Sequence, residues 1–508
     1  MTQAKVFLIG AGPGDPGLMT IKGVDALKKA DVIIYDHLVN EAILTHRRKD
    51  ARLIYAGKEG GNHSLSQEQI NTCLVTEAGK GLTVARLKGG DPFIFGRGGE
   101  EVEFLAQRGI YFEVIPGVSS AIAAPAYAGI PLTHRSYASS VAFITGHEDP
   151  TKDKSRIHWE SLAKIETLVF LMGVKNLPHI TTQLMAAGKP PSTPAALIHW
   201  GTMPGQKTLA GSLDTLDKLA EEQGFTPPAV LVVGHVVSLR PALNWFEKKP
   251  LLGKGIVITR PEAQAEEFQT LLQAEGAQTY LFPTIQIIPP ETFQILDQKI
   301  KTAGKYDWLI FTSANAVRFF FQRIKEIPYD IRNLKGIKIC AIGPTTARCI
   351  EAYGLSVDLI PEKFSSEGII AAFCKENIKG KNILIPRAEK TRNILPHELT
   401  ASGANVDCVT AYRTVASGRK KEELINWINE GRINVITFTS PSTVEHLMAM
   451  MEGSYHLLQG IKIACIGPVT AEASRKAGLD VDILQERYIV PAMVQSICEY
   501  FEIQERRC

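Results

Sequence analysis

The sequence lacks the features that mark several broad classes of protein. Its eight cysteines include no C-x-x-C pair and no Cys/His cluster with zinc spacing, so neither a zinc site nor a disulfide framework is expected. A net charge of +3 is too small to indicate nucleic-acid binding. The apolar N-terminal run breaks at Gly10, far short of the roughly 20 residues of a membrane span, and is no signal peptide. We expect a cytoplasmic protein with no nucleic-acid or membrane partner and no metal.

The glycine-rich loop near the N-terminus lacks the third glycine of a dinucleotide-binding fingerprint. In the stretch IGAGPGDPGLMT, residues 9–20, Asp15 occupies the position where G-x-G-x-x-G requires glycine. A carboxylate there would repel a pyrophosphate, and Pro13 and Pro16 stiffen the loop. The loop therefore favours a ligand that is cationic or neutral where it meets the protein.

The order of apolar and amphipathic segments predicts an α/β protein. At 508 residues the chain has room for about three domains of roughly 150 residues each. β-Branched runs alternate with amphipathic helical stretches, which indicates α/β layers with largely parallel strands. Prolines and lysines interrupt this rhythm at residues 239–255, where we expect an exposed linker. The predicted parts are an N-terminal half, a linker, a C-terminal half and a tail, at residues 1–245, 246–252, 253–503 and 504–508.

The C-terminal half contains an internal repeat. WLIFTSANAV and KICAIGPTTA, which begin at residues 308 and 338, match VITFTSPSTV and KIACIGPVTA, which begin at 435 and 462. The opening segments GIVITRP and NILIPRA also correspond. The repeat predicts two similar α/β lobes facing each other, with a ligand in the cleft between them.

Unusual residues of the N-terminal half repeatedly follow apolar runs. Because ligands of open α/β sheets bind beyond the carboxyl ends of the strands, we expect these residues to share one rim. Each of these residues could instead simply form a turn at the end of a strand, since Gly and Asp favour turns. The positions concerned are Asp36, Lys58, residues 89–91, residues 146–147, residues 172–173 and Gly201.

Four motifs of the N-terminal half resemble a known family. GAGPGDPGLMTIKG, YDHLV, LKGGDPFIFGRGGEE and AGIPLTHR are similar to the uroporphyrinogen-III C-methyltransferases of the tetrapyrrole methyltransferase superfamily, over nearly all of residues 4–245. The resemblance implies a dimeric two-domain α/β fold with S-adenosylmethionine as methyl donor. It also implies methylation of uroporphyrinogen III at C-2 and C-7, which gives precorrin-2.

The same resemblance implies roles for individual residues. Asp36 would be the proton acceptor and Lys58 the proton donor, although Lys58 could equally be a solvated surface lysine. A carboxylate suits the first role because the pyrrole N–H becomes more acidic as the ring carbon is methylated. Arg97, His134 and Arg135 are candidates for binding substrate carboxylates. The implied cofactor contacts are Pro13, Gly89, Gly90, Asp91, Ile94, Ser119, Ser120, Met172 and Gly201.

Helix starts dominate the motifs of the C-terminal half. Ser313 and Ser440, in the twin FTS segments, are predicted N-caps, and Pro344 and Pro468 stand where a first-turn proline is favoured. Caps are commonly structural, but helix N-termini also bind anions. Four such loops on facing lobes therefore suggest a ligand with many carboxylates.

These motifs, with ITRP and AYRT, resemble uroporphyrinogen-III synthase over residues 253–503. The resemblance implies closure of hydroxymethylbilane with inversion of ring D and loss of water, without metal or organic cofactor. Tyr412 is the candidate proton donor, although a buried core tyrosine with a satisfied hydroxyl would look the same. Ser313, Thr346, Ser440 and Thr470 are the candidate substrate contacts.

Two alternatives stay open from the sequence. The first half could methylate another corrin intermediate or a protein, and the second could be a bilobal module that binds a tetrapyrrole without chemistry. Whether precorrin-2 goes on to siroheme, cobalamin or haem is not determined, because no dehydrogenase or chelatase segment accompanies the two halves. The first half is expected to form a homodimer.

Overall fold

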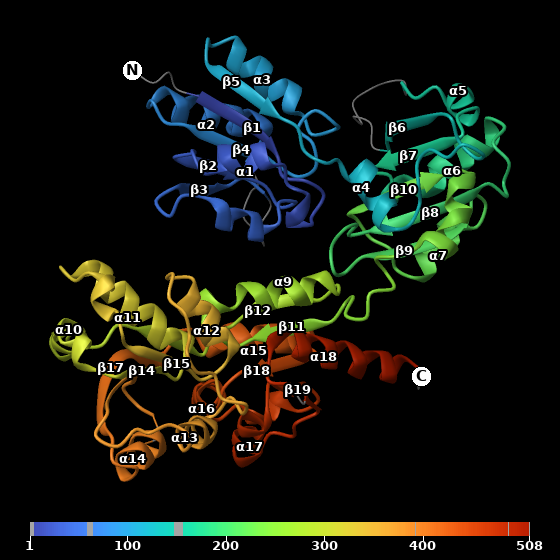
Figure 1. Cartoon of the computed structure of the whole chain (residues 1–508). Coiled ribbons are helices and arrows are strands. Elements are labelled where there is room, and N and C mark those ends of the chain that lie inside the picture. The colour runs from blue at the N-terminus through green and yellow to red at the C-terminus, as the bar shows by residue number, and fades with distance from the viewer. Residues whose placement is uncertain (1–4, 58–64, 147–155, 392, 486, 507–508) are drawn as a thin grey trace. The chain divides into compact units, whose positions relative to one another are not determined.

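The structure is a computed structural model that describes residues 5–57, 65–146, 156–391, 393–485 and 487–506. Its contacts divide the chain into two compact units. One contains Met1–Lys254 with Leu272–Gln278 and Phe501–Cys508, and the other contains Gly255–Leu271 and Thr279–Tyr500. Figure 1 colours the chain from blue at the N-terminus to red at the C-terminus. Each unit has two five-stranded sheets flanked by helices, so the predicted α/β class is confirmed.

The first sheet has five parallel strands in the order β3-β2-β4-β1-β5. Alternate side chains of the first strand enter different cores, Phe7 and Ile9 on one face and Val6 and Leu8 on the other. Burial on both faces explains the continuous apolar runs. Because all five strands are parallel, their carboxyl ends lie at one edge. The elements are β1 (Lys5–Gly10), α1 (Ile21–Leu27), β2 (Val32–Tyr35), β3 (Arg52–Tyr55), α2 (Gln67–Gly79), β4 (Val84–Lys88), α3 (Gly98–Ala106) and β5 (Tyr111–Ile115).

The second sheet, ordered β6-β7-β10-β8-β9, departs from the expected parallel pattern. Only β6 and β7 pair in parallel; the other three pairings are antiparallel. A short connection joins β8 to β9, and such a connection allows only antiparallel pairing. The elements are α4 (Ser120–Tyr127), β6 (Val141–Thr145), α5 (Trp159–Ala163), β7 (Thr167–Leu171), α6 (Leu177–Ala186), β8 (Pro194–His199), β9 (Lys207–Ser212), α7 (Leu216–Glu222), β10 (Ala229–Val233) and α8 (Arg240–Leu243).

The stretch at residues 239–255, where the sequence predicts an exposed linker, is not exposed throughout. Phe246 and Leu251 are buried. Trp245 donates its indole N–H to Ala126 O at 3.1 Å, and the rings of Trp245 and Phe246 lie 5.0 and 4.8 Å from that of Tyr127. Isolated aromatic residues among prolines and lysines produce no periodic pattern, which is why the sequence did not reveal this packing.

The second unit holds one sheet ordered β12-β11-β18-β19-β20 and one ordered β13-β17-β16-β14-β15. Its strands are β11 (Gly255–Ile258), β12 (Gln278–Leu281), β13 (Ile285–Ile288), β14 (Trp308–Phe311), β15 (Lys338–Ala341), β16 (Asn382–Ala388), β17 (Asn405–Ala416), β18 (Val435–Phe438), β19 (Lys462–Cys465) and β20 (Ile483–Leu484). Its helices are α9 (Glu266–Ala274), α10 (Gln294–Lys301), α11 (Ala314–Glu326), α12 (Pro344–Glu351), α13 (Ser366–Phe373), α14 (Ile394–Ala401), α15 (Lys421–Asn429), α16 (Pro441–Met450), α17 (Pro468–Lys476) and α18 (Val490–Glu505).

The internal repeat of the sequence is confirmed as a structural repeat. The matched segments form β11, β18 and β19 in one sheet and β16, β14 and β15 in the other, and the three strands are neighbours in the same order in both. The β18–β19 and β14–β15 pairs are both parallel. The two sheets therefore define two lobes of similar design, one of which is interrupted in sequence by the other.

Candidate functional site

Three glycine backbones meet at the carboxyl edge of the first sheet. A Cβ atom on Gly117 would lie 2.3 Å from Gly90 O, and one on Gly10 would lie 2.4 Å from Gly117 N. Gly12 and Gly90 also exchange backbone hydrogen bonds of 3.2 and 2.7 Å. Gly10 and Gly117 are required because a side chain on either would collide with neighbouring backbone.

The glycine turn after β4 faces the start of α4. Gly90 has a φ of +68°, and a Cβ atom on it would have only Ser120 N at 3.8 Å and Ser119 Cα at 3.9 Å near it. Ser119 caps α4 by accepting from Ala121 N at 3.2 Å. The Asp91 carboxylate accepts from Gly117 N at 3.0 Å and from Phe93 N at 2.8 Å. Four predicted cofactor residues, Gly90, Asp91, Ser119 and Ser120, are thus brought together.

Asp15 serves the protein itself, which explains an acid in a glycine-rich loop. One carboxylate oxygen accepts from Gly17 N at 2.8 Å and the other from the Tyr127 hydroxyl at 2.7 Å. Burial, together with this bond to Asp15, raises the pKa of Tyr127. The backbone N–H of Asp15 donates to Thr202 Oγ1 at 3.1 Å. The loop is therefore tied to α4 and to the turn after β8.

Backbone strain gathers at the predicted cofactor loops. Within the described ranges, five residues other than glycine have φ values between +44° and +71°, a conformation that costs of order 1–3 kcal/mol each and is often kept at functional sites. One of the five is Met172 itself, two lie on either side of Gly201, and two lie shortly after Ile94. A Cβ atom on Gly201 would lie 2.3 Å from Ala124 Cβ, so this turn packs directly on α4. The five residues are Phe95, Arg97, Met172, Trp200 and Thr202.

A network of hydrogen bonds that the sequence did not reveal holds the turn after β8 in place. Thr202 N donates to Gln206 Oε1 at 2.7 Å, and Gln206 Nε2 donates to Glu247 Oε1 at 2.8 Å. Arg240 donates to the other Glu247 oxygen and to Ala128 O, both at 2.6 Å. Glu247 and Arg240 lie in the stretch predicted to be a linker, and no motif signals them.

Asp36 follows β2 and is partly exposed. Its carboxylate accepts from Arg86 Nη2 and from Leu38 N, each at 3.2 Å. A Cβ atom on Gly89 would lie 2.7 Å from Leu38 Cβ, so the glycine turn packs against the Asp36 loop. Lys58, the predicted proton donor, lies outside the described residues.

The predicted site residues lie along two sheet edges, so the expectation of one rim is wrong. Asp36 and residues 89–91 follow strands of the first sheet, whereas Gly146, Met172 and Gly201 follow strands of the second. In the second sheet β7 and β8 are both antiparallel to β10, which places their carboxyl ends at one edge. The hydrogen bonds of Asp15 and the packing of Gly201 on α4 join the two groups.

The remaining candidates of the first half lie on separate elements. Pro13 and Ile94 are partly buried, and Met172 is exposed. Arg97 stands at the start of α3 in a 2.6 Å ion pair with Glu100. His134 Nδ1 accepts from Ser136 N at 3.1 Å, and the neighbouring Arg135 is exposed.

Tyr412 and Ser313 meet in the second unit. The two hydroxyl oxygens are 3.1 Å apart, and Ser313 Oγ accepts from Ala316 N at 3.1 Å as the predicted N-cap of α11. Burial raises the pKa of Tyr412, while hydrogen bonds from Ser313 and Asn315 oppose the shift. Its hydroxyl therefore stays protonated at neutral pH. The ring belongs to the core of its lobe and stacks 5.9 Å from Phe319.

The other helix starts of the second unit fall where the sequence predicts them. Ser440 caps α16, and its Oγ lies 2.9 Å from Ser442 Oγ. Pro344 and Pro468 open α12 and α17. Thr346 and Thr470, the other two predicted substrate contacts, are only 4% and 3% exposed.

Arg260 adds a cation that the sequence analysis missed, although it lies in the ITRP motif. It follows β11, and burial lowers the pKa of its guanidinium. Arg260 Nη2 is 3.5 Å from Gln264 Oε1, and Gln264 Nε2 donates to Asn315 Oδ1 at 2.7 Å. This contact joins the lobe of β11 to the start of α11, where Ser313 lies.

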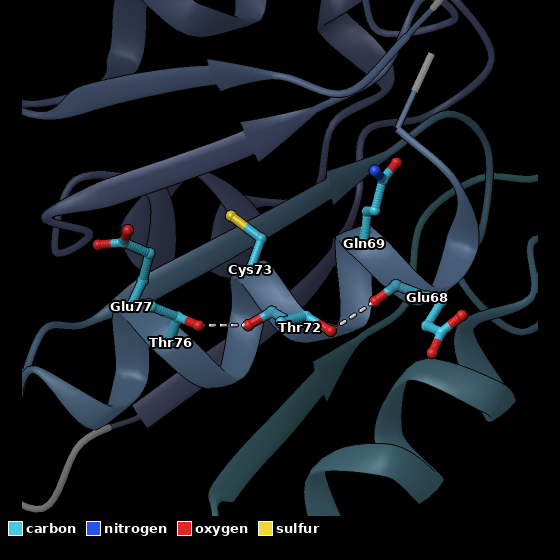
Figure 2. A pocket seen from close by; sticks show the side chains of 6 residues that line it. All are labelled: Glu68, Gln69, Thr72, Cys73, Thr76 and Glu77. Atoms are coloured by element: carbon cyan, nitrogen blue, oxygen red, sulfur yellow. Dashed lines mark hydrogen bonds between the residues drawn. The ribbon is translucent and has the colours of Figure 1, made fainter. Parts of the chain in front are cut away.

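One pocket of the first unit lies away from these residues. Figure 2 shows a shallow pocket along one face of α2, where hydrogen bonds of 2.8 Å join the Thr76 and Thr72 hydroxyls to backbone carbonyls. A single helix lines this pocket, and it contains none of the predicted residues. The described residues include no cluster of possible metal ligands and no helix long and apolar enough to cross a membrane. The seven described cysteines form no disulfide with one another.

Comparisons with known proteins match both halves of the chain. A family model described as tetrapyrrole (corrin/porphyrin) methylases matches residues 5–217, and one described as uroporphyrinogen-III synthase HemD matches residues 266–495. The porphyrin biosynthesis protein HemD of Ruminiclostridium josui is 36% identical over 98% of both chains. The uroporphyrinogen-III C-methyltransferase of Priestia megaterium is 54% identical over 46% of this chain and 99% of its own. The S-adenosyl-L-methionine-dependent uroporphyrinogen III methyltransferase of Methanosarcina barkeri is 52% identical over 47% of this chain and 94% of its own.

Proposed function

The chain belongs to the family of the porphyrin biosynthesis protein HemD, and it matches both a tetrapyrrole methylase and a uroporphyrinogen-III synthase, so we propose that one polypeptide both makes and methylates uroporphyrinogen III. It is a bifunctional enzyme of tetrapyrrole biosynthesis, with an S-adenosylmethionine-dependent methyltransferase and a synthase. The match to the Ruminiclostridium josui protein carries this conclusion, because it extends over 98% of this chain and therefore includes both halves. The proposed reactions are closure of hydroxymethylbilane to uroporphyrinogen III and methylation at C-2 and C-7 to precorrin-2.

The residues around the glycine turn fit a bulky cofactor. Gly90 carries no side chain beside Ser119 and Ser120, so a ligand can approach the backbone there, and the backbone at Met172 and Gly201 is held in fixed turns. We assign the cofactor contacts to these residues, with Pro13, Gly89, Asp91 and Ile94. S-Adenosylmethionine, when bound, supplies an electrophilic methyl group. The chain contributes alignment, which matters most when an electron-rich pyrrole carbon is the nucleophile.

Asp36 is the proposed proton acceptor of the methyltransferase. Its carboxylate is partly exposed and is oriented by Arg86 and Leu38 N. When the ring carbon gains a methyl group, the pyrrole nitrogen becomes acidic and its proton passes to a nearby base. Lys58 is retained as the proposed donor, and Arg97, His134 and Arg135 as contacts for the substrate carboxylates.

The synthase half is proposed to work without a cofactor. The Tyr412 hydroxyl can donate its proton to the hydroxyl that departs from hydroxymethylbilane as water. Ser313, 3.1 Å away, is placed to orient the Tyr412 hydroxyl. Substrate carboxylates are proposed to meet the capped helix starts at Ser313 and Ser440 in a cleft between the lobes, with Thr346 and Thr470 as further contacts.

The domain limits that we propose follow the compact units and not the boundary at residue 245 that the sequence predicts. We place the end of the methyltransferase near residue 254, because Phe246, Glu247 and Leu251 make buried contacts. The synthase then begins at residue 255. A homodimer through the methyltransferase is proposed, with small tetrapyrroles as the only partners.

One assay tests both activities. The purified chain receives hydroxymethylbilane with or without S-adenosylmethionine, and the products are separated by chromatography. We expect the type III isomer without the methyl donor and its dimethylated derivative with it. Only the type I isomer, which forms spontaneously, would contradict the synthase assignment. Unmethylated type III product in the presence of the donor would contradict the methyltransferase assignment.

A further inference from the structure

A chain of four charged side chains runs inward from Asp36. Arg86 Nη2 lies 3.2 Å from Asp36 Oδ2, and Arg86 Nε lies 3.3 Å from Glu101 Oε1. Lys88 Nζ lies 2.8 Å from the same Glu101 oxygen. The side chains of Arg86, Lys88 and Glu101 are 3%, 5% and 0% exposed, whereas that of Asp36 is 28% exposed. Of the four, Asp36 alone can meet a substrate.

The fold fixes how Arg86 approaches Asp36. Arg86 and Lys88 are two residues apart on β4, so both side chains project from the same face of the sheet. Arg86 Nη1 donates to Leu87 O at 3.0 Å and to Ile34 O, on β2, at 3.4 Å. These backbone contacts hold the guanidinium plane, while Nε faces Glu101 and Nη2 faces Asp36.

Glu101 supplies a buried negative charge that both cations need. Buried ions are costly unless they are paired and hydrogen-bonded. Glu101 Oε1 accepts from Arg86, Lys88 and also Gln67 Nε2, at 3.1 Å, while Oε2 has no hydrogen-bond partner among the described residues. Burial and then repulsion from Arg86 lower the pKa of Lys88. One internal carboxylate therefore faces two cations, and Asp36 completes the pairing from the rim.

We propose that Glu101 is a positioning residue that acts through Arg86 to hold the Asp36 carboxylate toward the substrate. This inference rests on the proposed role of Asp36 as proton acceptor. Without the charge of Glu101, Arg86 and Lys88 have Asp36 as their nearest anion. The Asp36 carboxylate is then drawn inward, away from the tetrapyrrole. Methyl transfer slows, while cofactor binding, which uses other residues, is retained.

A double-mutant cycle separates this role from a merely structural one. The full chain is made with Glu101→Gln, with Asp36→Asn, with both changes, and with Glu103→Gln as a control that removes the same charge from the exposed face of α3. Single-turnover methylation is measured with both substrates saturating, cofactor affinity by calorimetry, and folding by thermal unfolding. If Glu101→Gln does not fold, Glu101→Asp takes its place, because the shorter side chain moves the negative charge away from Arg86 and weakens the same pairing; a smaller slowing in the same direction is then expected.

We expect Glu101→Gln to slow methyl transfer by about tenfold with cofactor affinity within about twofold of the parent, and Glu103→Gln to leave both unchanged. In the Asp36→Asn background, Glu101→Gln should cause no further slowing, because residues that act through one another are not additive. Equal slowing in both backgrounds, or a parental rate in Glu101→Gln, overturns the inference alone. A parental rate in Asp36→Asn overturns the proposed role of Asp36 and this inference with it.

Discussion

Asp36 is held by two different hydrogen-bond donors but keeps part of its carboxylate exposed, as a proton acceptor requires. We expect Asp36→Asn to reduce single-turnover methylation at least about 100-fold, the usual scale of acid–base catalysis. Affinity for S-adenosylmethionine, measured by calorimetry, should change little because the carboxamide occupies the same volume. A parental rate at saturating substrate would remove Asp36 from this role.

Gly90 has a left-handed backbone, and a Cβ atom on it would make only ordinary contacts with Ser119 and Ser120. Its replacement therefore separates backbone strain from exclusion of the ligand. We expect Gly90→Val to destabilise folding by about 1–2 kcal/mol and to weaken cofactor binding at least about tenfold. Gly109→Val is the matched control, because Gly109 has a φ of +64°, a Cβ atom on it would meet nothing within 4 Å, and it lies away from the site. Urea unfolding and calorimetry should show similar stability losses in both variants but loss of affinity in Gly90→Val alone. Equal affinities would show that the glycine turn is structural.

Tyr412 could be a catalytic acid or a core residue, and removing its hydroxyl separates these roles. We expect Tyr412→Phe to lose only about 1 kcal/mol of stability with its hydrogen bond to Ser313, yet to let the spontaneous type I isomer dominate. Tyr329→Phe is the control, because the buried Tyr329 hydroxyl has no hydrogen-bond partner in the described part of the chain. Chromatography of the isomers gives the result. Type III product at the parental rate would place proton donation elsewhere.

At the scale of elements, Glu113 ties β5 to β1 and α1. Its carboxylate lies 2.6 Å from the ammonium groups of both Lys22 and Lys5. The hydrogen bond from Lys22, followed by that from Lys5, lowers the pKa of Glu113 from 4.5 to about 2. A carboxylate whose pKa is lower in the folded protein than in the unfolded chain stabilises the fold at pH values above the unfolded pKa. This stabilisation is lost as the pH falls from 4.5 toward 2.

We therefore expect Glu113→Gln to lower the free energy of unfolding at pH 7 by at most about 1 kcal/mol, because solvent screens these partly exposed ion pairs. The difference from the parent should shrink below pH 4.5 and vanish near pH 2, as denaturant titrations at several pH values would show. A difference that stays constant from pH 7 to pH 3 would mean that the contribution is not electrostatic. Glu103→Gln, on exposed α3 surface, provides the control.

The repeated strand–helix units show what local sequence achieves without tertiary information. FTS and IGP segments form the same capped helix starts in both lobes, because N-cap serines and first-turn prolines act within one turn. The side of the sheet on which a helix packs, and which lobe receives it, depends on distant strands. The antiparallel pairs of the second sheet were missed for that reason.

At the scale of the whole molecule, the boundary between the activities can be tested by cutting the chain. A piece that ends at residue 245 loses Phe246, which packs on Tyr127, and Glu247, which holds Gln206. We expect residues 1–254 to methylate uroporphyrinogen III and residues 1–245 to bind the methyl donor at least about tenfold more weakly. The matched single change, Glu247→Gln in the 1–254 piece, should reproduce part of that loss. Equal affinity in both pieces would restore the boundary at 245.

The complementary piece, residues 255–508, should make the type III isomer without the first half. If both pieces work alone, the fusion contributes mainly proximity, since the proposed product of one half is the proposed substrate of the other. Activity of the full chain alone would instead mean that the halves share a core or a site.

Periodicity was enough to predict the α/β class, and the motifs were enough to predict the helix caps and the repeat in the second half. The motifs also carried both family resemblances, which the comparisons confirm. These features can be predicted because helix caps, strand alternation and long motifs each depend on residues that are close together in the sequence. The site residues named from the sequence stay predictions.

Only the tertiary structure decided which distant groups meet. Asp15 bonds to Tyr127, Glu247 supports Thr202 through Gln206, and Glu101 reaches Asp36 through Arg86. Each pairing joins elements remote in sequence, and a lone glutamate or arginine carries no sign of its partner. Burial of charge is settled by packing, which brings such residues together or leaves them in water. For that reason the sequence determined the chemistry available to this protein, whereas the fold determined which carboxylates support it and which one faces outward.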